Sequence, residues 1–216
     1  MKKNKRIFLI VIVILIIAII FGIVKIVNKN SPKEQMLSKI YQDLEESQAY
    51  LFEIEKNNNN KTIMAKKGDK TIIDQYTKNS ETNVENHTTT LVKDNNTYLI
   101  LHDRKEYYVY TENNVEQTIV TDGLKEIISK SYTIGTEKIK GKKYSYEEYD
   151  GSSMFMISNL ININDTNVKT RFYFDSKNNL AYIKTILDNK QELLKVTLEK
   201  DVKDSIFEIP SDYAEN

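Results

Sequence analysis

The sequence predicts an α+β fold in which one N-terminal transmembrane helix precedes a domain built on an antiparallel sheet of about ten strands. Three observations predict it: an uncharged apolar run near the N-terminus, many short segments of alternating apolar and polar residues, and two amphipathic stretches. The chain has 216 residues, which suits one anchor and one globular domain. We expect a cytoplasmic tail at 1–6, the anchor at 7–27 and an extracytoplasmic β-rich domain at 28–216.

The expected transmembrane helix rests on residues 7–24, which carry no charged side chain and are almost all aliphatic or aromatic. A helix of this length spans about 27 Å, close to the hydrocarbon thickness of a bilayer. Three lysines and Arg6 precede the run, so the positive-inside rule places the N-terminus in the cytoplasm and the domain outside. We therefore expect a single-pass protein of the plasma membrane, in contact with the lipid bilayer through this helix.

A cleaved signal peptide is the alternative interpretation of the same run. The apolar stretch is too long for the h-region of a signal peptide, and no small-x-small cleavage site follows it. A lipoprotein signal requires a cysteine, and the chain contains none. The pattern therefore favours a retained anchor.

Composition and charge exclude several function classes. The absence of cysteine excludes disulfides, zinc–thiolate sites and cysteine nucleophiles. The first 30 residues hold six of the 31 basic residues and no acidic one, so the rest of the chain carries a net charge of −6. Nucleic-acid binding requires a basic face, and we therefore expect no nucleic-acid partner.

The domain is predicted to start with a helix and to continue as an antiparallel meander with one helix inserted midway. Residues 31–34 (SPKE) form a capping box with proline at the first helical position, which predicts a helix at 32–47. A second helix is predicted at 121–131. Segments bounded by turns rich in Asn, Asp and Gly predict strands at 50–54, 62–65, 72–77, 88–92, 98–101, 107–110, 132–139, 144–149, 169–174, 180–187 and 193–199.

The residues that carry catalytic chemistry are few. His87 and His102 each stand near a predicted strand end without a further ligand at HxH or HxxxH spacing, so we expect solvated strand-end residues and no metal site. Glu147 and Glu148 are adjacent on a strand, so they point to opposite faces and cannot form a glycosidase pair. The chain has no GxSxG motif and no glycine-rich phosphate loop. We therefore expect no catalytic residues, no cofactor and no enzymatic activity.

An apolar segment at 154–163 is the best candidate for a ligand site. Methionine side chains adapt to irregular hydrophobic surfaces, so this segment either fills the core or lines a cavity, and both alternatives stay open. The predicted second helix could close over the same space. The candidate ligand-lining residues are Leu124, Ile127, Ile128, Met154, Phe155 and Met156.

Two short motifs resemble those of the LolA-like lipoprotein-carrier superfamily. Residues 170–175 (TRFYFD), a turn and residues 180–184 (LAYIK) are similar to a late hairpin of that family, with Ala181 where the family often has proline. The ending at 207–213 (FEIPSDY) resembles the closing F-x-I-P-x-x-Y pattern of the family. The resemblance covers residues 32–213 in layout but only about twenty positions in detail, and it transfers no ligand residues.

The resemblance implies an open half-barrel whose concave face is covered by the leading and mid-chain helices, with an apolar cavity for acyl chains. The leading hypothesis is a non-catalytic, membrane-tethered domain that binds lipid or lipoprotein acyl chains in an apolar groove. The alternative is a sensor or interaction subunit of a cell-envelope complex, with a filled core, a protein partner and no ligand.

Overall fold

The computed structural model describes residues 35–57, 59–79, 81–111, 120–151, 168–187 and 190–216. These residues belong to a compact unit that begins at Gln35. The expected anchor at 7–27 and the apolar segment at 154–163 lie outside the described residues. Within the part of the chain that is described, no helix is long and apolar enough to cross a membrane.

The described residues form a single sheet of twelve strands, in the order β12-β6-β5-β4-β3-β2-β1-β11-β10-β9-β8-β7. All neighbours are antiparallel except β12 and β6, which are parallel. The strands are β1 (Ala49–Asn57), β2 (Asn60–Lys67), β3 (Lys70–Lys78), β4 (Glu85–Lys93), β5 (Asn96–Leu101), β6 (Glu106–Tyr110), β7 (Tyr132–Ile139), β8 (Lys142–Asp150), β9 (Val168–Phe174), β10 (Leu180–Leu187), β11 (Lys190–Glu199) and β12 (Ala214–Glu215).

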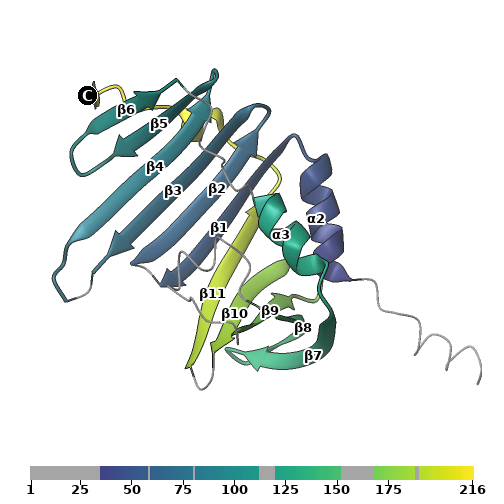
Figure 1. Ribbon diagram of the computed structural model, residues 1–216. Coiled ribbons are helices and arrows are strands. Elements are labelled where there is room, and N and C mark those ends of the chain that lie inside the picture. The colour runs from purple at the N-terminus through teal and green to yellow at the C-terminus, as the bar shows by residue number, and fades with distance from the viewer. Residues whose placement is uncertain (1–34, 58, 80, 112–119, 152–167, 188–189) are drawn as a thin grey trace, which may run out of the picture. The chain divides into compact units, whose positions relative to one another are not determined.

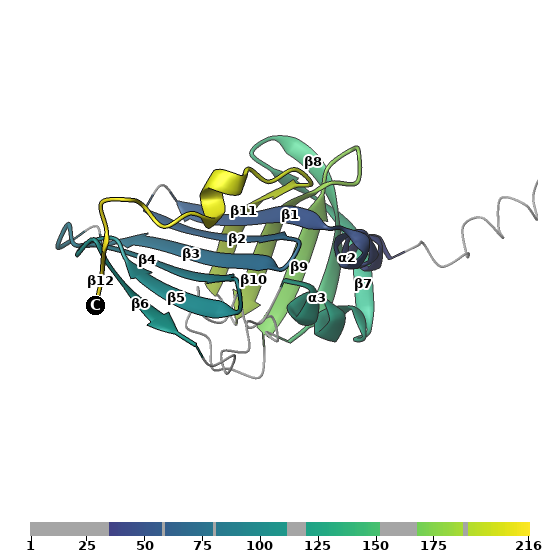
Figure 2. The same cartoon turned by 90° about the horizontal axis from the view of Figure 1, so that it is seen from above.

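The sheet consists of two meanders that meet where β1 pairs with β11 (Figure 1). It is curved and does not close, since β7 and β12 are its two ends (Figure 2). The predicted antiparallel sheet is thus confirmed, its curved, unclosed form agrees with the expected half-barrel, and all eleven predicted strands are present. The two-residue strand β12 was not predicted, because its pairing with β6 joins segments about a hundred residues apart.

Turn chemistry explains why the hairpins are tight. The β4–β5 turn has positive φ at both central residues, Asp94 (52°) and Asn95 (60°). The β7–β8 turn has the same property at Lys140 (48°) and Gly141 (81°). Two successive positive φ angles match the right-handed twist of the flanking strands, and Asn, Asp and Gly adopt them at the lowest cost.

Two helices cover one face of the sheet, and we call this face the helix face. They are α2 (Met36–Glu46) and α3 (Val120–Ile128), which lie side by side in Figure 1. Along β1, alternate side chains point to this face, as strand geometry requires. The buried core here comprises Leu37, Ile40, Leu44, Tyr50, Phe52, Ile54, Met64, Val120, Leu124, Ile127, Tyr149, Phe172, Phe174, Leu180, Ile183, Leu194 and Val196.

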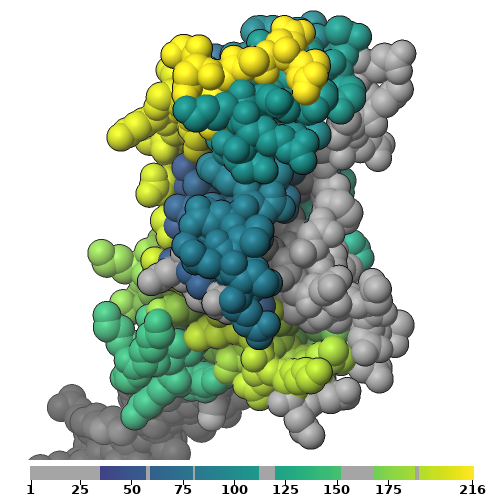
Figure 3. All heavy atoms as spheres, turned by 90° about the vertical axis from the view of Figure 1, so that its left-hand side faces the viewer, coloured from purple at the N-terminus to yellow at the C-terminus, as the bar shows by residue number. Residues whose placement is uncertain are grey.

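The C-terminal segment covers part of the opposite face, which we call the outer face. It contains the 3-10 helix η1 (Asp204–Phe207) and then runs over the β5–β6 end of the sheet (Figures 2 and 3). Val202 and Phe207 are buried there against the strand residues whose side chains point to the outer face. The sheet therefore has a core on each face, and the strand residues of the outer core are Ala65, Ile72, Leu91 and Ile100.

The leading helix differs from its prediction at the N-terminus. It begins at Met36 and not at Pro32, because Gln35 has an extended backbone conformation. The side chain of Gln35 does not cap it; instead, the backbone N–H groups of Met36 and Leu37 donate to the carboxylate of Glu147 on β8, at 2.5 and 3.1 Å. A tertiary contact therefore caps the first turn of α2, and the predicted capping box at 31–34 lies outside the described residues.

Candidate functional site

The α3 residues predicted to line a ligand cavity lie in the core of the helix face. Leu124 and Ile127 have no exposed surface, and Ile128 is half-buried against the same cluster. The structure brings these three residues together as the sequence suggested. Their role as ligand-lining residues stays a prediction. The other three candidates, Met154, Phe155 and Met156, lie outside the described residues.

A row of side chains on the helix face extends beyond the part of the sheet that α2 and α3 bury. The strand registers place seven residues opposite one another in sequence, from β11 through β1 to β6. We call this set the apolar row, and it comprises Leu198, Phe52, Met64, Ile73, Thr90, Leu99 and Tyr108. None of its members is charged, and Thr90 and Tyr108 are the members that carry a hydroxyl group.

From β1 to β6, burial decreases along the apolar row. Phe52 and Met64 are buried, with 0% and 4% of their surfaces exposed. Ile73, Leu99 and Tyr108 are only half-buried. The neighbouring row across β3 to β6 has the same character and carries Thr71, Val92, Thr97 and Tyr110. These two rows of the β3–β6 half of the helix face therefore present aliphatic, threonine and tyrosine side chains that are incompletely covered, apart from the buried Thr97. The next row on this half carries Gln75 and Glu106.

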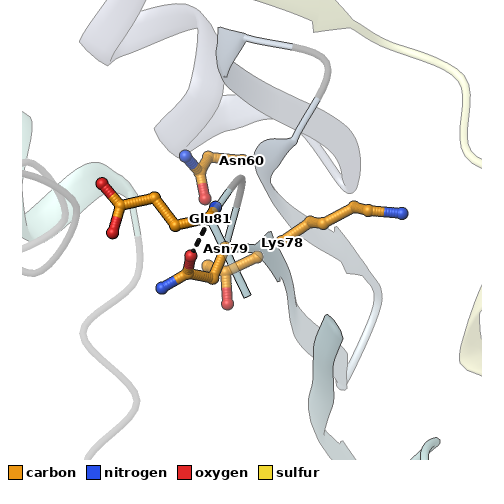
Figure 4. A pocket seen from close by; sticks show the side chains of 5 residues that line it. Asn60, Lys78, Asn79 and Glu81 are labelled. Carbon is orange, nitrogen blue, oxygen red and sulfur yellow. Dashed lines mark hydrogen bonds between the residues drawn. The ribbon is translucent and has the colours of Figure 1, made fainter. Parts of the chain in front are cut away.

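A hollow near the end of the β3–β4 hairpin has a different character (Figure 4). It measures about 530 Å³, and its lining residues are Asn60, Thr77, Lys78, Asn79 and Glu81. The Asn79 side-chain oxygen accepts hydrogen bonds from the backbone N–H groups of Glu81 and Thr82 at 2.9 and 3.0 Å. These two bonds stabilise the turn between β3 and β4. A polar, open hollow of this kind does not suit an acyl chain.

The two histidines lie on the outer face and contact each other. Their rings are stacked with centroids 3.7 Å apart and planes at 11°. His87 Nε2 lies 2.9 Å from Asp74 Oδ1, and His102 Nε2 lies 2.8 Å from the Thr89 hydroxyl. The prediction of solvated histidines is wrong, since both side chains are half-buried. The antiparallel pairing of β4 with β5 brings the two strand ends, and with them the two rings, together.

Burial lowers the pKa of His102, and the neighbouring His87 lowers it further, while Asp74 opposes both effects. His102 is therefore held as a neutral imidazole over most of the physiological pH range. A neutral imidazole has one N–H donor and one free acceptor. His102 Nδ1 lies 2.9 Å from the hydroxyl of Tyr213, which links the pair to the C-terminal segment.

A charged network occupies the outer face of β7 to β10. Arg171 donates to Glu137 at 2.9 Å and to Glu148 at 2.5 Å, and Lys184 also donates to Glu137. Partial burial by itself raises the pKa of Glu137, but the hydrogen bonds from Lys184, Tyr173 and Arg171 lower it below its usual range. Each carboxylate in this network has cationic partners, so the network stabilises the sheet.

Comparison with solved structures shows likeness at low sequence identity. LprF from Mycobacterium bovis matches with a TM-score of 0.48 and 11% identity, over 83% of this chain and 96% of that one. An uncharacterized conserved protein from Thermus thermophilus matches with 0.45 and 8%, over 84% and 96%. The lipoprotein LppX of Mycobacterium tuberculosis matches with 0.40 and 12%, over 80% and 99%. Likenesses this distant assign neither a family nor a function.

No protein-family model matches the chain, and no curated protein matches it. The curved, unclosed antiparallel sheet with its two helices agrees with the architecture that the resemblance to the LolA-like superfamily implied. Membership of that superfamily stays a prediction.

Proposed function

We propose that this domain binds the acyl chains of a lipid or lipoprotein on the β3–β6 half of its helix face, without catalysis. The apolar row carries the proposal, because it runs without a charged residue from the buried core under α2 and α3 to half-buried positions on β6. A ligand seated along it would continue the core of the protein. This role needs only apolar surface, which the row supplies.

Hydrophobic transfer gives this surface a preference for long chains. Each CH₂ group that leaves water contributes about 0.8 kcal/mol. Threonine and tyrosine side chains within the surface, such as Thr90 and Tyr108, add hydroxyl groups that can meet the ester or amide end of a lipid. A lipid with an apolar tail and a polar linkage therefore fits better than a small polar metabolite.

The membrane tether belongs to the same proposal. The uncharged run at 7–24 and the basic residues before it support a single-pass anchor with a cytoplasmic N-terminus. Since the chain has no cysteine, the variants Asn4→Cys and Asn95→Cys each introduce a unique thiol. A membrane-impermeant maleimide added to intact cells should label only the Asn95→Cys protein. Labelling of Asn4→Cys under these conditions would contradict the proposed orientation.

Photo-cross-linking in membranes tests the ligand site directly. Vesicles that contain the full chain and a phospholipid with a diazirine in its acyl chain are irradiated, and cross-linked peptides are identified by mass spectrometry. We expect cross-links on peptides that contain Leu99 and Tyr108. The variant Leu99→Gln should reduce these cross-links. Val109→Gln should not, because Val109 is also half-buried but its side chain points to the outer face. Cross-links confined to the 7–27 segment would overturn the proposal.

A protein-binding role is the second candidate, and the sheet edge favours it. Strand β7 is the last strand of the described sheet, and its residue Ile134 is 51% exposed. An edge strand presents unpaired backbone groups on which a partner can add a strand. An envelope protein that is captured by wild type and lost with Ile134→Lys, while lipid cross-linking is absent, would favour this function over lipid binding.

A further inference from the structure

Three side chains on the outer face place possible metal ligands close together. Asp74 lies on β3, His87 on β4 and His102 just after β5, and one donor atom of each lies within 4.8 Å of the other two. Two of the separations are known: Asp74 Oδ1 is 2.9 Å from His87 Nε2 and 3.9 Å from His102 Nε2. All three residues are half-buried.

Strand register explains why residues so far apart in the sequence meet here. Asp74 lies opposite Thr89, and Tyr76 opposite His87, so Asp74 and His87 are diagonal neighbours on one face of the β3–β4 pair. The backbone N–H of His102 donates to the carbonyl of His87 at 3.1 Å. The ladder thus holds both histidines at adjacent positions beside one carboxylate.

The spacing fits a tetrahedral ion. Metal–nitrogen and metal–oxygen bonds of about 2.0–2.2 Å at tetrahedral angles require ligand atoms about 3.3 Å apart. The two separations from Asp74 lie on either side of this value. Because the imidazole rings are stacked, coordination by both Nε2 atoms requires one ring to turn about its Cβ–Cγ bond. His87 is the ring that can turn, since 35% of its side chain is exposed and 19% of that of His102.

Outer contacts already orient two of the three groups. Tyr213 contacts the Nδ1 atom of His102, which leaves Nε2 directed toward Asp74 and Thr89. The Thr89 hydroxyl donates to Asp74 Oδ1. Because the Thr89 hydroxyl gives its one proton to Asp74, it accepts from the Nε2–H of His102 in the metal-free cluster. Coordination through Nε2 therefore requires this proton to move to Nδ1, which then donates to the Tyr213 hydroxyl. Metal-binding histidines commonly make such a hydrogen bond with their second nitrogen.

We propose that Asp74, His87 and His102 form a binding site for a first-row divalent transition-metal ion of the Zn²⁺ class, with the fourth position open to water. Two imidazoles and one carboxylate favour Zn²⁺, Co²⁺, Ni²⁺ or Cu²⁺ over Mg²⁺ and Ca²⁺, which prefer oxygen ligands. The ion would cross-link β3, β4 and the end of β5, and through His102 and Tyr213 it would hold the C-terminal segment to the sheet. A hydrogen-bonded cluster that takes no metal is the competing outcome.

The composition makes the test specific, because the chain has two histidines and no cysteine. The full chain is purified in detergent without a histidine tag, stripped with EDTA, titrated with ZnCl₂ and dialysed, and bound zinc is measured by mass spectrometry. We expect one zinc per chain, shifts of both imidazole resonances, and a visible d–d spectrum of tetrahedral type when Co²⁺ replaces zinc.

Variants separate the site from surface carboxylates. His87→Gln, His102→Gln and Asp74→Asn should each weaken zinc binding at least about tenfold. The exposed His87→Gln change keeps the test valid if Asp74→Asn impairs folding. Asp103→Asn is the matched control, since Asp103 follows His102 in the sequence but is exposed and lies near Arg104. Substoichiometric zinc, or uptake that both histidine variants retain, would overturn the proposal and leave the hydrogen-bonded cluster.

Discussion

The buried carboxylate of Glu147 accepts a hydrogen bond from the backbone N–H of Leu37 at 3.1 Å, across 110 residues of sequence. Its other oxygen accepts the N–H of Met36, and the hydroxyl of Tyr149 donates to the carboxylate at 2.8 Å. A negative charge at a helix N-terminus satisfies unpaired N–H groups and complements the helix dipole. Strand β8 thus supplies the cap of α2.

Loss of this cap should destabilise the domain. In Glu147→Ala the N–H groups of Met36 and Leu37 lose their buried acceptor, and we expect the free energy of unfolding to fall by about 2 kcal/mol. Urea unfolding of the detergent-solubilised chain, followed by circular dichroism, measures the change. Glu208→Ala, at an exposed position, is the control. Equal unfolding midpoints for the two variants would show that the cap contributes nothing.

The charged network on the outer face should make stability depend on acidic pH. The pKa of Glu137 in the folded protein is lower than its ordinary value of 4.5. The unfolded chain therefore binds the proton more readily, so the contribution of Glu137 is complete above pH 4.5 and is lost as pH falls through the folded-state pKa. In Glu137→Gln the urea midpoint should fall less steeply between about pH 5 and about pH 3. Parallel curves for wild type and variant would contradict this.

Gly135 makes room for the ring of Tyr146. A Cβ atom at this position would overlap the ring, which packs under the guanidinium of Arg171 at 4.6 Å. In Gly135→Ala the ring must swing away and the cation–π contact is lost, at a cost of about 1 kcal/mol. The same change in a Tyr146→Ala background should cost much less, and a double-mutant cycle of urea unfolding measures the difference. Additive effects would exclude the clash.

The core under α3 should respond strongly to truncation. Leu124 has no exposed surface, so Leu124→Ala should lower the free energy of unfolding by about 2–5 kcal/mol, through lost transfer energy and the cavity that remains. Lys125→Ala, on the exposed side of the same helix, should change it by less than about 0.5 kcal/mol. Thermal unfolding of the two variants compares them, and similar melting temperatures would show that α3 does not anchor the core.

Local patterns were sufficient for most elements of the fold. Strand periodicity and turn residues such as Asp94 and Asn95 predicted all eleven long strands, because both signals depend on residues close together in the chain. The mid-chain helix was predicted at 121–131 and observed at Val120–Ile128. The leading helix was predicted to begin at Pro32, and this was wrong because its actual cap, Glu147, comes from another strand.

The candidate sites were less accessible to sequence reasoning. Leu124, Ile127 and Ile128 lie together in the core because helical spacing puts them on one face of α3, and their role as ligand-lining residues stays a prediction. The apolar row and the His87–His102 pair were missed, because each combines residues from several strands. One signal for the pair was present in the sequence: each histidine ends or flanks one of two consecutive strands, which an antiparallel hairpin brings together.

The sequence by itself determined the strands, the turns, the amphipathic helices, the absence of cysteine chemistry and the acidic charge of the domain. Tertiary structure alone decided that β1 pairs with β11, that Glu147 caps α2, and that Asp74 lies beside His87 and His102. The physical reason is the distance along the sequence over which each kind of interaction acts. Backbone geometry and side-chain periodicity act over a few residues, whereas register and the meeting of distant strands depend on the packing of the whole sheet.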